Sequence, residues 1–189
     1  MGTFSVPGYF AAHRRLADAI DHDALQAGIE VVRAAYDAGR QIITCGNGGS
    51  AYAASHYITD WNKIVTAATG RPFRGISLSD NLGLLTAFAN DVAFDEIFAG
   101  QLRAILQPRD LVIAISGSGN SPNVVKAVEY ANAAGAVTLA LVGYDGGALR
   151  RHAQHSVWVP SFDMQLCEDV HLFFGHMVMK ALCGLPITE

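Results

Sequence analysis

Residues 111–127, LVIAISGSGNSPNVVKA, join an apolar run to a helical pattern through a turn crowded with small polar residues. The run LVIAI is apolar at every position, as in a strand of a parallel sheet that is buried on both faces. Pro122 suits the first turn of a helix, where its missing N–H costs nothing. A buried strand that leads directly into a helix is the repeating unit of an α/β fold with a parallel sheet.

Short β-branched runs and helical patterns alternate along the rest of the chain. The runs predict strands at 41–45, 74–78, 110–115, 137–142 and 156–159. Apolar residues spaced three and four apart predict helices at 10–38, 50–66, 94–106, 121–134 and 164–183. Gly39, Gly135 and Gly184 are placed to end helices. We therefore expect one three-layer α/β/α domain over residues 1–189, with right-handed crossovers and a long N-terminal helix.

Composition narrows the function classes. The chain has 189 residues, of which 51% are hydrophobic and 16% charged, so a sizeable core is expected. A net charge of −4 argues against nucleic acid as the main ligand. Three cysteines without a CxxC pair indicate neither a disulfide framework nor a cysteine metal site. No run reaches the length of a membrane span, so we expect a cytoplasmic protein without a membrane or nucleic-acid partner.

Two loops are placed to bind a ligand. In a sheet of this kind, ligands bind beyond the carboxyl ends of the strands, near a topological switch point. The first loop, CGNGGSA at 45–51, follows the first strand, and the second, SGSGNS at 116–121, follows the third. A common glycine-rich turn remains the alternative interpretation of the first loop.

The second loop combines three hydroxyls with two glycines and the free N–H groups of a helix N-terminus. That combination suits a phosphate dianion without any lysine, and it matches neither the P-loop nor the GxGxxG pattern. The alternative is a serine-rich turn that only caps the helix, although a cap needs one hydroxyl. The loop therefore predicts a site for a phosphoryl group on a small molecule.

The helix after the first loop, SAYAASHYITDWNK at 50–63, places His56 and Asp60 four residues apart on one face. This spacing suits two ligands of one metal ion, a histidine–carboxylate pair, or an ordinary exposed pair. The aromatic residues Tyr52, Tyr57 and Trp61, together with the preceding loop, favour a functional site over an exposed pair.

The last helix carries Glu168, Asp169, His171 and His176 in an otherwise apolar segment. Polar groups in such a segment are costly unless they are paired or ligated. Helical spacing alone favours Glu168 with His171, because Glu168 and His176 lie two turns apart and about 80° offset around the axis. A hydrogen-bonded core position is the alternative for His171.

Four motifs in order resemble the SIS (sugar isomerase) domain: CGNGGSA, AFANDVAFDEIF at 87–98, ISGSGNSPNVVKA and GYDGG at 143–147. The closer resemblance is to the phosphoheptose isomerases, which convert sedoheptulose 7-phosphate to D-glycero-D-manno-heptose 7-phosphate. It spans residues 10–183. The resemblance implies a flavodoxin-like fold, with a five-stranded parallel sheet flanked by helices. It also implies a homotetramer with active sites between subunits.

The resemblance also implies roles for individual residues. It implies Asp60 and His176 as the catalytic base and acid, in an order left open. The implied metal ligands are His56, Asp60, Glu168 and His176. The implied substrate contacts are Asn47, Gly48, Ser50, Asp91, Ser116, Gly117, Ser118, Gly119, Asn120, Ser121 and Glu168. Asp91 has the alternative of a helix-capping or turn residue.

Two positions depart from the family pattern, since many members have Glu where this chain has Asp60 and Gln where it has Glu168. Two imidazoles and two carboxylates suit Zn²⁺, Mn²⁺ or Fe²⁺, with Zn²⁺ the ion expected. We expect a metal-dependent aldose–ketose isomerase that acts through an enediol. The alternatives are an isomerase for another ketose phosphate, a sugar-phosphate sensor, or a tetrameric scaffold resembling the DnaA initiator-associating protein. A scaffold has no reason to keep the acid–base set, and the sensors carry an additional DNA-binding module.

Overall fold

The computed structural model describes residues 3–188. Its five strands form one parallel sheet in the order β2-β1-β3-β4-β5. The strands are β1 (Ile42–Gly46), β2 (Gly75–Ser77), β3 (Leu111–Ser116), β4 (Val137–Val142) and β5 (His155–Trp158). Each strand end lies within one residue of the predicted position. The five-stranded parallel sheet is confirmed, and its order is the flavodoxin-like one.

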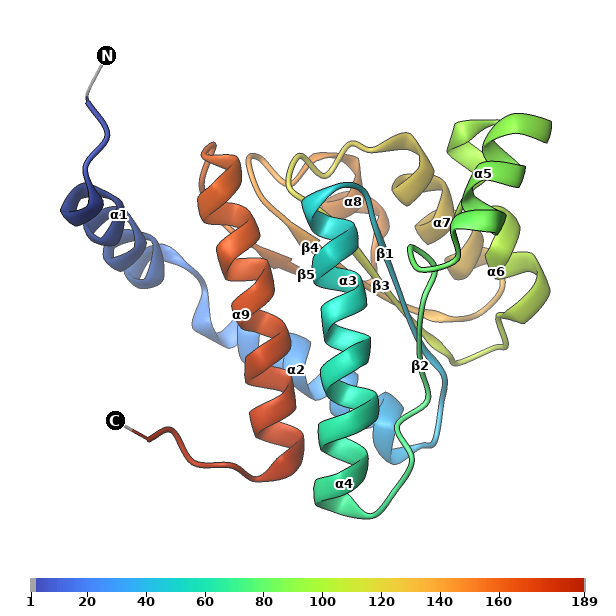
Figure 1. Cartoon of the computed structure of the whole chain (residues 1–189), viewed down its shortest axis with the longest axis horizontal. Helices are drawn as coiled ribbons and strands as arrows, with labels where there is room; N and C mark the ends of the chain where they lie inside the picture. Colours follow the sequence, from blue (N-terminus) through green and yellow to red (C-terminus); the bar gives the residue numbers. More distant parts are fainter. Residues whose placement is uncertain (1–2, 189) are drawn as a thin grey trace.

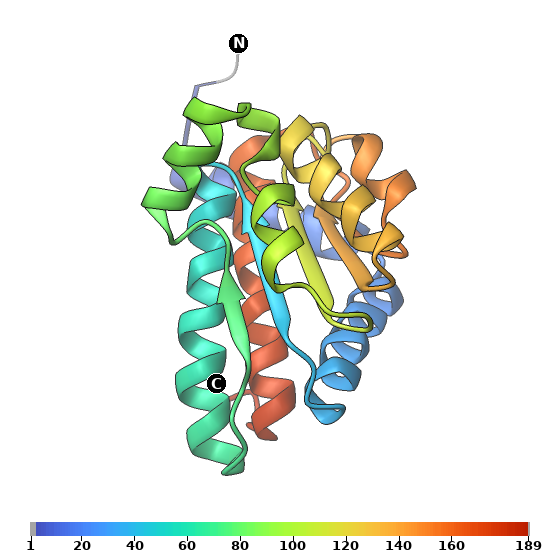
Figure 2. The same cartoon turned by 90° about the vertical axis from the view of Figure 1, so that its right-hand side faces the viewer.

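Helices cover both faces of the sheet and make three layers (Figures 1 and 2). One face packs against α2 (His22–Asp37), α3 (Gly49–Asp60) and α9 (Met164–Cys183). The other packs against α6 (Ala99–Ile105), α7 (Pro122–Ala133) and α8 (Gly147–His152). Successive residues of a strand point to opposite faces, so Ile113 and Ile115 join the first core and Val112 and Ala114 the second.

The single long helix predicted at 10–38 is wrong. The chain forms α1 (Val6–Ala19) and α2, with Ile20 in an extended conformation between them. The helix is interrupted at Asp21, whose side chain accepts a hydrogen bond from the N–H of Ala24 at 3.0 Å and so caps the start of α2. As a result α1 projects from the body, at the upper left of Figure 1, and only Leu16 of its residues is buried.

Four shorter elements were not predicted. They are α5 (Leu82–Asp91), α8, a π-helical turn at Trp61–Val65 that joins α3 to α4 (Thr66–Thr69), and a 3₁₀ turn at Phe94–Glu96. The π turn interrupts the helix predicted at 50–66, and the 3₁₀ turn replaces the first turn of the helix predicted at 94–106. The three predicted helix-ending glycines all have positive φ, with 65° at Gly39, 77° at Gly135 and 63° at Gly184.

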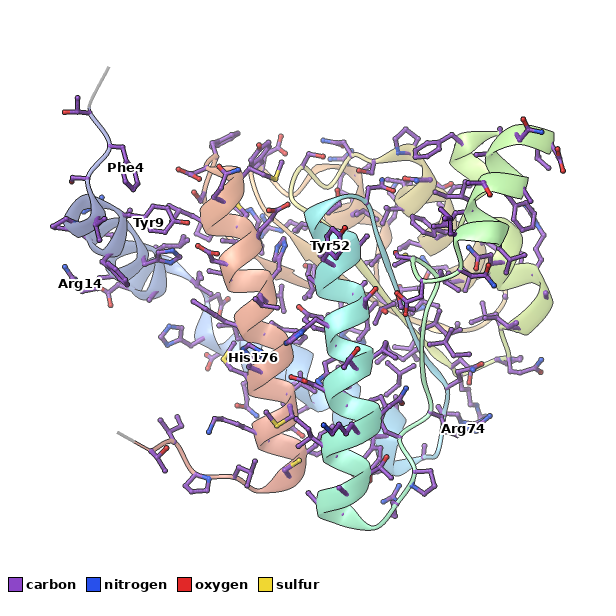
Figure 3. All side chains as sticks on the ribbon, in the orientation of Figure 1. Phe4, Tyr9, Arg14, Tyr52, Arg74 and His176 are labelled. Atoms are coloured by element: carbon purple, nitrogen blue, oxygen red, sulfur yellow. The ribbon has the colours of Figure 1, made fainter. Side chains whose placement is uncertain are left out.

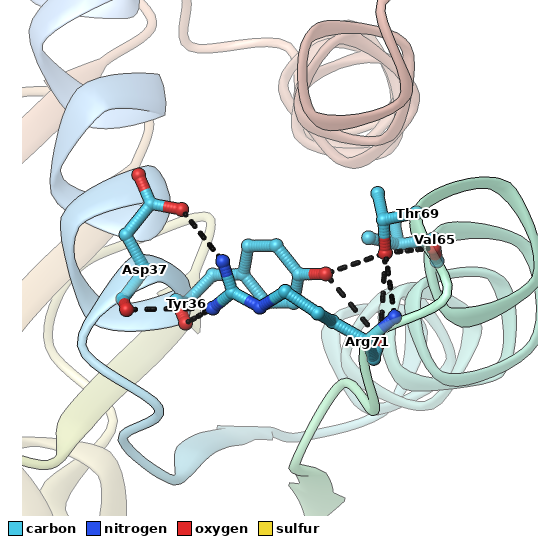
Figure 4. A network of polar contacts seen from close by, with 5 residues as sticks. All are labelled: Tyr36, Asp37, Val65, Thr69 and Arg71. Carbon is cyan, nitrogen blue, oxygen red and sulfur yellow. Dashed lines mark hydrogen bonds and ion pairs between the residues drawn. The ribbon is translucent and has the colours of Figure 1, made fainter.

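A polar network joins α2 to the end of α4, at the amino edge of the sheet (Figure 4). The Tyr36 hydroxyl lies 2.6 Å from Thr69 Oγ1, and Arg71 donates to the carbonyl of Tyr36 at 2.9 Å. The Arg71 guanidinium also lies over the Tyr36 ring, 4.5 Å from its centroid. These contacts hold α2 to the end of the continuous helical segment formed by α3, the π turn and α4. This end lies opposite the ligand loops.

Large apolar side chains remain exposed at several places, among them α1 and α5. Phe4, Val6 and Phe10 are exposed on and before α1, and α5 buries none of the residues that the structure describes in it. Between residues 3 and 188, no helix combines the length and the apolar character that crossing a membrane requires.

Candidate active site

The two ligand loops meet at the topological switch point of the sheet. β1 and β3 are neighbours, with Gly46 paired to Ile115, and the strand order reverses between them. Asn47 from the first loop and Asn123 from α7 exchange two amide hydrogen bonds, of 2.8 and 2.9 Å. Asn123 is only 1% exposed, and its role was missed from the sequence. The available signal was a polar residue directly after Pro122, at the start of an otherwise apolar helix face.

A small cavity of about 110 Å³ lies between these loops and the start of α9. Its lining holds hydroxyls, an amide and one carboxylate, and among the described residues that form it there is no lysine or arginine. The lining residues are Asn47, Ser50, Ile115, Ser116, Gly117, Ser118, Ser121, Met164 and Glu168. The structure thus brings together Glu168 and six of the substrate-binding residues predicted in the two loops.

The serine loop does more than cap α7. Ser121 occupies the N-cap position, but in the described chain its hydroxyl makes no capping bond and lies 3.2 Å from the hydroxyl of Ser116. The hydroxyl of Ser118 accepts from the N–H of Asn120 at 3.2 Å. With its hydroxyls gathered beside a helix N-terminus, the loop has the donors that an anion needs.

The segment GYDGG supports the serine loop from behind. Gly119 has a φ of 66°, and an added Cβ there would overlap the carbonyl of Gly146. The side chain of Asn120 accepts from the N–H of Ala148 at 2.9 Å, and the carbonyl of Gly119 accepts from the N–H of Leu149 at 2.9 Å. The Asn120 side chain also donates to the carbonyl of Ser118 at 3.0 Å, so both ends of its carboxamide hold the loop and neither lines the cavity.

Glu168 lies against the first turn of α3. An added Cβ at Gly49 would overlap the Glu168 carboxylate, so the glycine makes room for it. Gly48 precedes this turn with a φ of 54°. The carboxylate of Glu168 lines the cavity of about 110 Å³, where it would repel a bound phosphate unless a cation offset its charge.

The second group of polar residues lies farther along α3, where this helix faces α9. His56 Nε2 lies 3.0 Å from His176 Nε2, and Asp60 Oδ2 lies 3.4 Å from His56 Nε2 and 3.9 Å from His176 Nε2. Figure 3 shows His176 on α9 beside α3. The side chains are 42%, 21% and 43% exposed for His56, Asp60 and His176, so solvent and a small ligand can reach them.

These three atoms have the spacing of metal ligands. Metal–ligand bonds of about 2.0–2.1 Å in tetrahedral geometry separate the ligand atoms by about 3.3 Å. The observed separations of 3.0, 3.4 and 3.9 Å bracket that value. Two imidazoles and one carboxylate form a three-ligand set that leaves a fourth position for a substrate or water. Glu168 is not part of this group, whose ligand atoms lie within 4.8 Å of one another.

The structure distinguishes the two histidines of α9. His176 joins His56 and Asp60, whereas His171 is 1% exposed and lies in the core, so the pairing of Glu168 with His171 that helical spacing favours does not form at this site. Within residues 3–188, neither ring nitrogen of His171 has a hydrogen-bond partner of normal geometry. Asp169 faces the other way and binds the Tyr9 hydroxyl and His13 of α1, at 2.6 and 2.8 Å.

Two expectations about neighbouring residues change. The aromatic residues do not surround the His56–Asp60 pair, because Tyr57 and Trp61 are fully buried in the core and Tyr52 is exposed at the start of α3. Asp91 is exposed at the end of α5 and accepts a hydrogen bond from its neighbour Asn90 at 2.7 Å. The structure of residues 3–188 does not bring Asp91 into the lining of the cavity between the loops.

The buried His171 predicts a loss of stability in mild acid. Burial lowers the pKa of His171 to about 4, below the value of about 6.5 in an unfolded chain. Between these values the unfolded state binds more protons, so stability is present above pH 6.5 and is lost as the pH falls toward 4. From pH 7.5 to 5 the expected contribution is about 2 kcal/mol. Urea unfolding at both pH values should show a smaller loss in His171→Leu than in wild type, and equal losses would contradict this origin.

Comparisons with known proteins identify the family of this chain. A family model described as the SIS domain matches residues 8–143. The chain is 38% identical over 162 residues to a phosphoheptose isomerase of Chlorobaculum parvum, covering 85% of this chain and 78% of that protein. It is 38% identical over 190 residues to that of Colwellia psychrerythraea, covering 98% and 91%. The solved phosphoheptose isomerase of Neisseria gonorrhoeae is similar with a TM-score of 0.86 and 28% identity, covering 95% of this chain and 97% of that one.

Proposed function

This chain belongs to the SIS domain family and, within it, to the phosphoheptose isomerases, and from this we propose that it converts sedoheptulose 7-phosphate to D-glycero-D-manno-heptose 7-phosphate with a bound divalent metal ion. Membership makes it a phosphosugar isomerase. The choice of substrate and the use of a metal ion are the proposed parts. One observation carries them: a phosphate-sized cavity and a three-ligand cluster lie along the same helix, α3.

The rise of α3 between the two regions is close to the length of a seven-carbon ketose phosphate. Ser50 lines the cavity and His56 belongs to the cluster, and six residues of α-helix rise about 9 Å. With carbon–carbon bonds of about 1.5 Å, an extended ketose 7-phosphate places its carbonyl carbon about 9 Å from phosphorus, and a ketose 5-phosphate is about 2.5 Å shorter. A phosphate held by the serine loop would therefore leave the carbonyl of a heptulose near the cluster.

Asp60 and His176 are the proposed acid–base pair. Aldose–ketose isomerisation takes a proton from one carbon, returns it to the neighbouring carbon, and moves a second proton between the two oxygens. Asp60 Oδ2 and His176 Nε2 are 3.9 Å apart, so one small ligand can contact both groups. An imidazole nitrogen bound to the ion cannot also carry a proton, so His176 would move a proton while its Nε2 is uncoordinated, and Asp60 through its second carboxylate oxygen. Their order in the reaction stays open.

The cluster fits a divalent cation in donor type and spacing, with His56, Asp60 and His176 as its ligands. Such an ion would supply polarisation of the substrate carbonyl. Glu168 stays a predicted fourth ligand, although its carboxylate is turned toward Gly49 and the cavity. Zn²⁺ is the ion we expect, because imidazole and carboxylate groups in a site with an open position suit it.

A panel of ketose phosphates tests this function. Protein supplied with Zn²⁺ is incubated with sedoheptulose 7-phosphate, fructose 6-phosphate and ribulose 5-phosphate, and aldose formation is followed. The highest kcat/KM is expected with the heptulose. Faster turnover of a shorter ketose would reassign the substrate. No aldose from any of them would favour the non-catalytic scaffold.

The serine loop should hold the phosphate. We expect the double change Ser118→Ala and Ser121→Ala to raise the Kd for sugar phosphate by about 100-fold or more. Each hydrogen bond to a charged group is worth about 1.5–3 kcal/mol. Calorimetric titration with sedoheptulose 7-phosphate and with inorganic phosphate measures the effect. Ser5→Ala, which removes a capping hydroxyl on α1, is the matched control. Unchanged affinity for both ligands in the double variant would remove this assignment.

We propose self-association as a homotetramer, with active sites between subunits. The exposed apolar side chains of α1 and α5 support this, because a monomer would leave them in water. Figure 3 shows Phe4 on the segment before α1, apart from the body of the chain. Light scattering should give four copies of the 20.1 kDa chain, about 80 kDa. A monomer at micromolar concentration would contradict both the tetramer and the shared sites.

A further inference from the structure

Two buried side chains, one on α3 and one at the start of the π turn that follows it, donate hydrogen bonds to the backbone of α9. The Tyr57 hydroxyl donates to the carbonyl of His171, and Trp61 Nε1 donates to the carbonyl of Gly175 at 3.0 Å. The donors are four residues apart, on α3 and the π turn that continues it, and the acceptors are four residues apart on α9. The two helices are therefore joined in a single register, one turn apart, by side chains that are both fully buried.

Each of these contacts lies one residue from a member of the candidate metal-ligand cluster, which consists of His56, Asp60 and His176. Tyr57 follows His56, Trp61 follows Asp60, and Gly175 precedes His176. The two rings are stacked with centroids 4.9 Å apart and an interplanar angle of 25°, so each ring packs against the other beside the cluster.

The close approach of the helices depends on Gly175. An added Cβ at this position would overlap the Tyr57 ring, so any side chain would push α9 away from α3. His56 and His176 reach 3.0 Å only because the helices come this close.

The π turn that starts at Trp61 adjusts the phase of the helix at this point. Trp61 points to α9, while the next residue, Asn62, exchanges two 3.0 Å hydrogen bonds with the backbone of Gly75 at the edge strand β2. A π turn inserts an extra residue into a helix and often occurs beside functional sites. Here it allows consecutive residues to contact α9 and the sheet without moving Asp60.

We propose that Trp61 and Tyr57 are positioning residues of the active site, whose hydrogen bonds to the α9 backbone hold His56, Asp60 and His176 at the spacing that a divalent cation requires. This rests on the function proposed above. The side chains of a helix extend about 5–6 Å from its axis, so a 20° rotation of α9 would move the His176 ring by about 2 Å. Metal–ligand distances vary by only about 0.2 Å around their usual values. The rotation of α9 therefore decides whether the cluster can bind a divalent cation.

The chain provides a matched control for each substitution. Trp158 Nε1 donates to the carbonyl of Tyr144 at 3.0 Å, the same kind of bond as that of Trp61 but outside the cluster. The Tyr36 hydroxyl bonds Thr69 at the amino edge of the sheet (Figure 4). Trp61→Phe is therefore compared with Trp158→Phe, and Tyr57→Phe with Tyr36→Phe.

Titration of metal-free protein with Co²⁺ alone should show a Kd raised by about 10–100-fold in Trp61→Phe and Tyr57→Phe, as is usual when the partners that orient metal ligands are lost. Both controls should stay within about threefold of wild type. In the Zn²⁺-supplied enzyme, kcat should fall in the first pair while KM for the ketose phosphate changes by less than about threefold, because the serine loop is untouched. Circular dichroism checks that each variant is folded. If Trp61→Phe does not fold, the comparison of Tyr57→Phe with Tyr36→Phe decides the proposal.

Equal Co²⁺ affinity and equal kcat in Trp61→Phe and Trp158→Phe would overturn the positioning proposal while leaving the proposed function intact. Wild-type protein that turns over ketose phosphates but binds no Co²⁺ would overturn the metal part, and with it the positioning of a cation site. Wild-type protein with neither property would overturn the proposed function and this inference together.

Discussion

Replacing Asp60 with Asn, or His176 with Ala, is expected to lower kcat for the ketose phosphate by about 10²- to 10⁴-fold, the range that acid–base groups contribute. Asn keeps the shape of Asp60 but cannot take a proton, and Ala removes the imidazole that lies 3.0 Å from His56. The measurement is the initial rate of aldose formation at saturating substrate. Affinity for inorganic phosphate should change little, because neither residue lines the serine cavity.

Two controls carry the same chemical changes elsewhere. Asp37→Asn alters a carboxylate that pairs with Arg71 at the amino edge of the sheet. His152→Ala removes an imidazole that pairs with Glu129. Both should keep kcat within about threefold of wild type. If Asp60→Asn retains more than a tenth of the wild-type kcat, Asp60 is not the group that moves the proton.

Removal of the metal ion is expected to have an effect of similar size. Chelation should lower turnover at least 100-fold, and added Zn²⁺ should restore it, because the ion would no longer polarise the carbonyl. The domain should remain folded, since apolar residues form a core on each face of the sheet. Metal analysis of purified protein should find about one ion per chain, because residues 3–188 contain one such three-ligand cluster.

Substitution of the two histidines outside the acid–base pair separates the ligand from the core residue. His56→Ala should lose the ion, because only two ligands of the cluster, Asp60 and His176, would remain to hold it. His171→Leu should keep it, since His171 is buried in the core and outside the cluster. Loss of metal in His171→Leu but not in His176→Ala would reverse the assignment of the α9 histidines. A chelated enzyme with full activity would leave Asp60 and His176 as a metal-free acid–base pair.

The features that the sequence predicted well are those encoded within a short segment. The five strands are continuous β-branched runs, and the three glycines that end helices adopt positive φ at the positions expected. The serine loop could be interpreted from ten residues because its hydroxyls, its glycines and the helix after it are adjacent in the chain. The role of Asn123 was missed because Asn123 contacts Asn47, which lies 76 residues away in the sequence.

Elements whose boundaries depend on partners were harder to predict. The apolar spacing continues from α1 into α2, and only the capping geometry of Asp21 shows where the chain turns. α5 was missed because it buries none of its described residues, so burial does not impose the periodic pattern from which helices are predicted.

The sequence by itself determined the sheet, the two ligand loops and the pairing of His56 with Asp60, because strand periodicity, turn chemistry and the i, i+4 spacing are local properties. Which polar residue of α9 meets that pair was decided only by the tertiary structure. The choice depends on how α9 is rotated about its axis, and that rotation is set by Tyr57 against Gly175 and by hydrogen bonds between residues 114 apart. Helical spacing describes angles within one helix, whereas the site is formed by the packing of two.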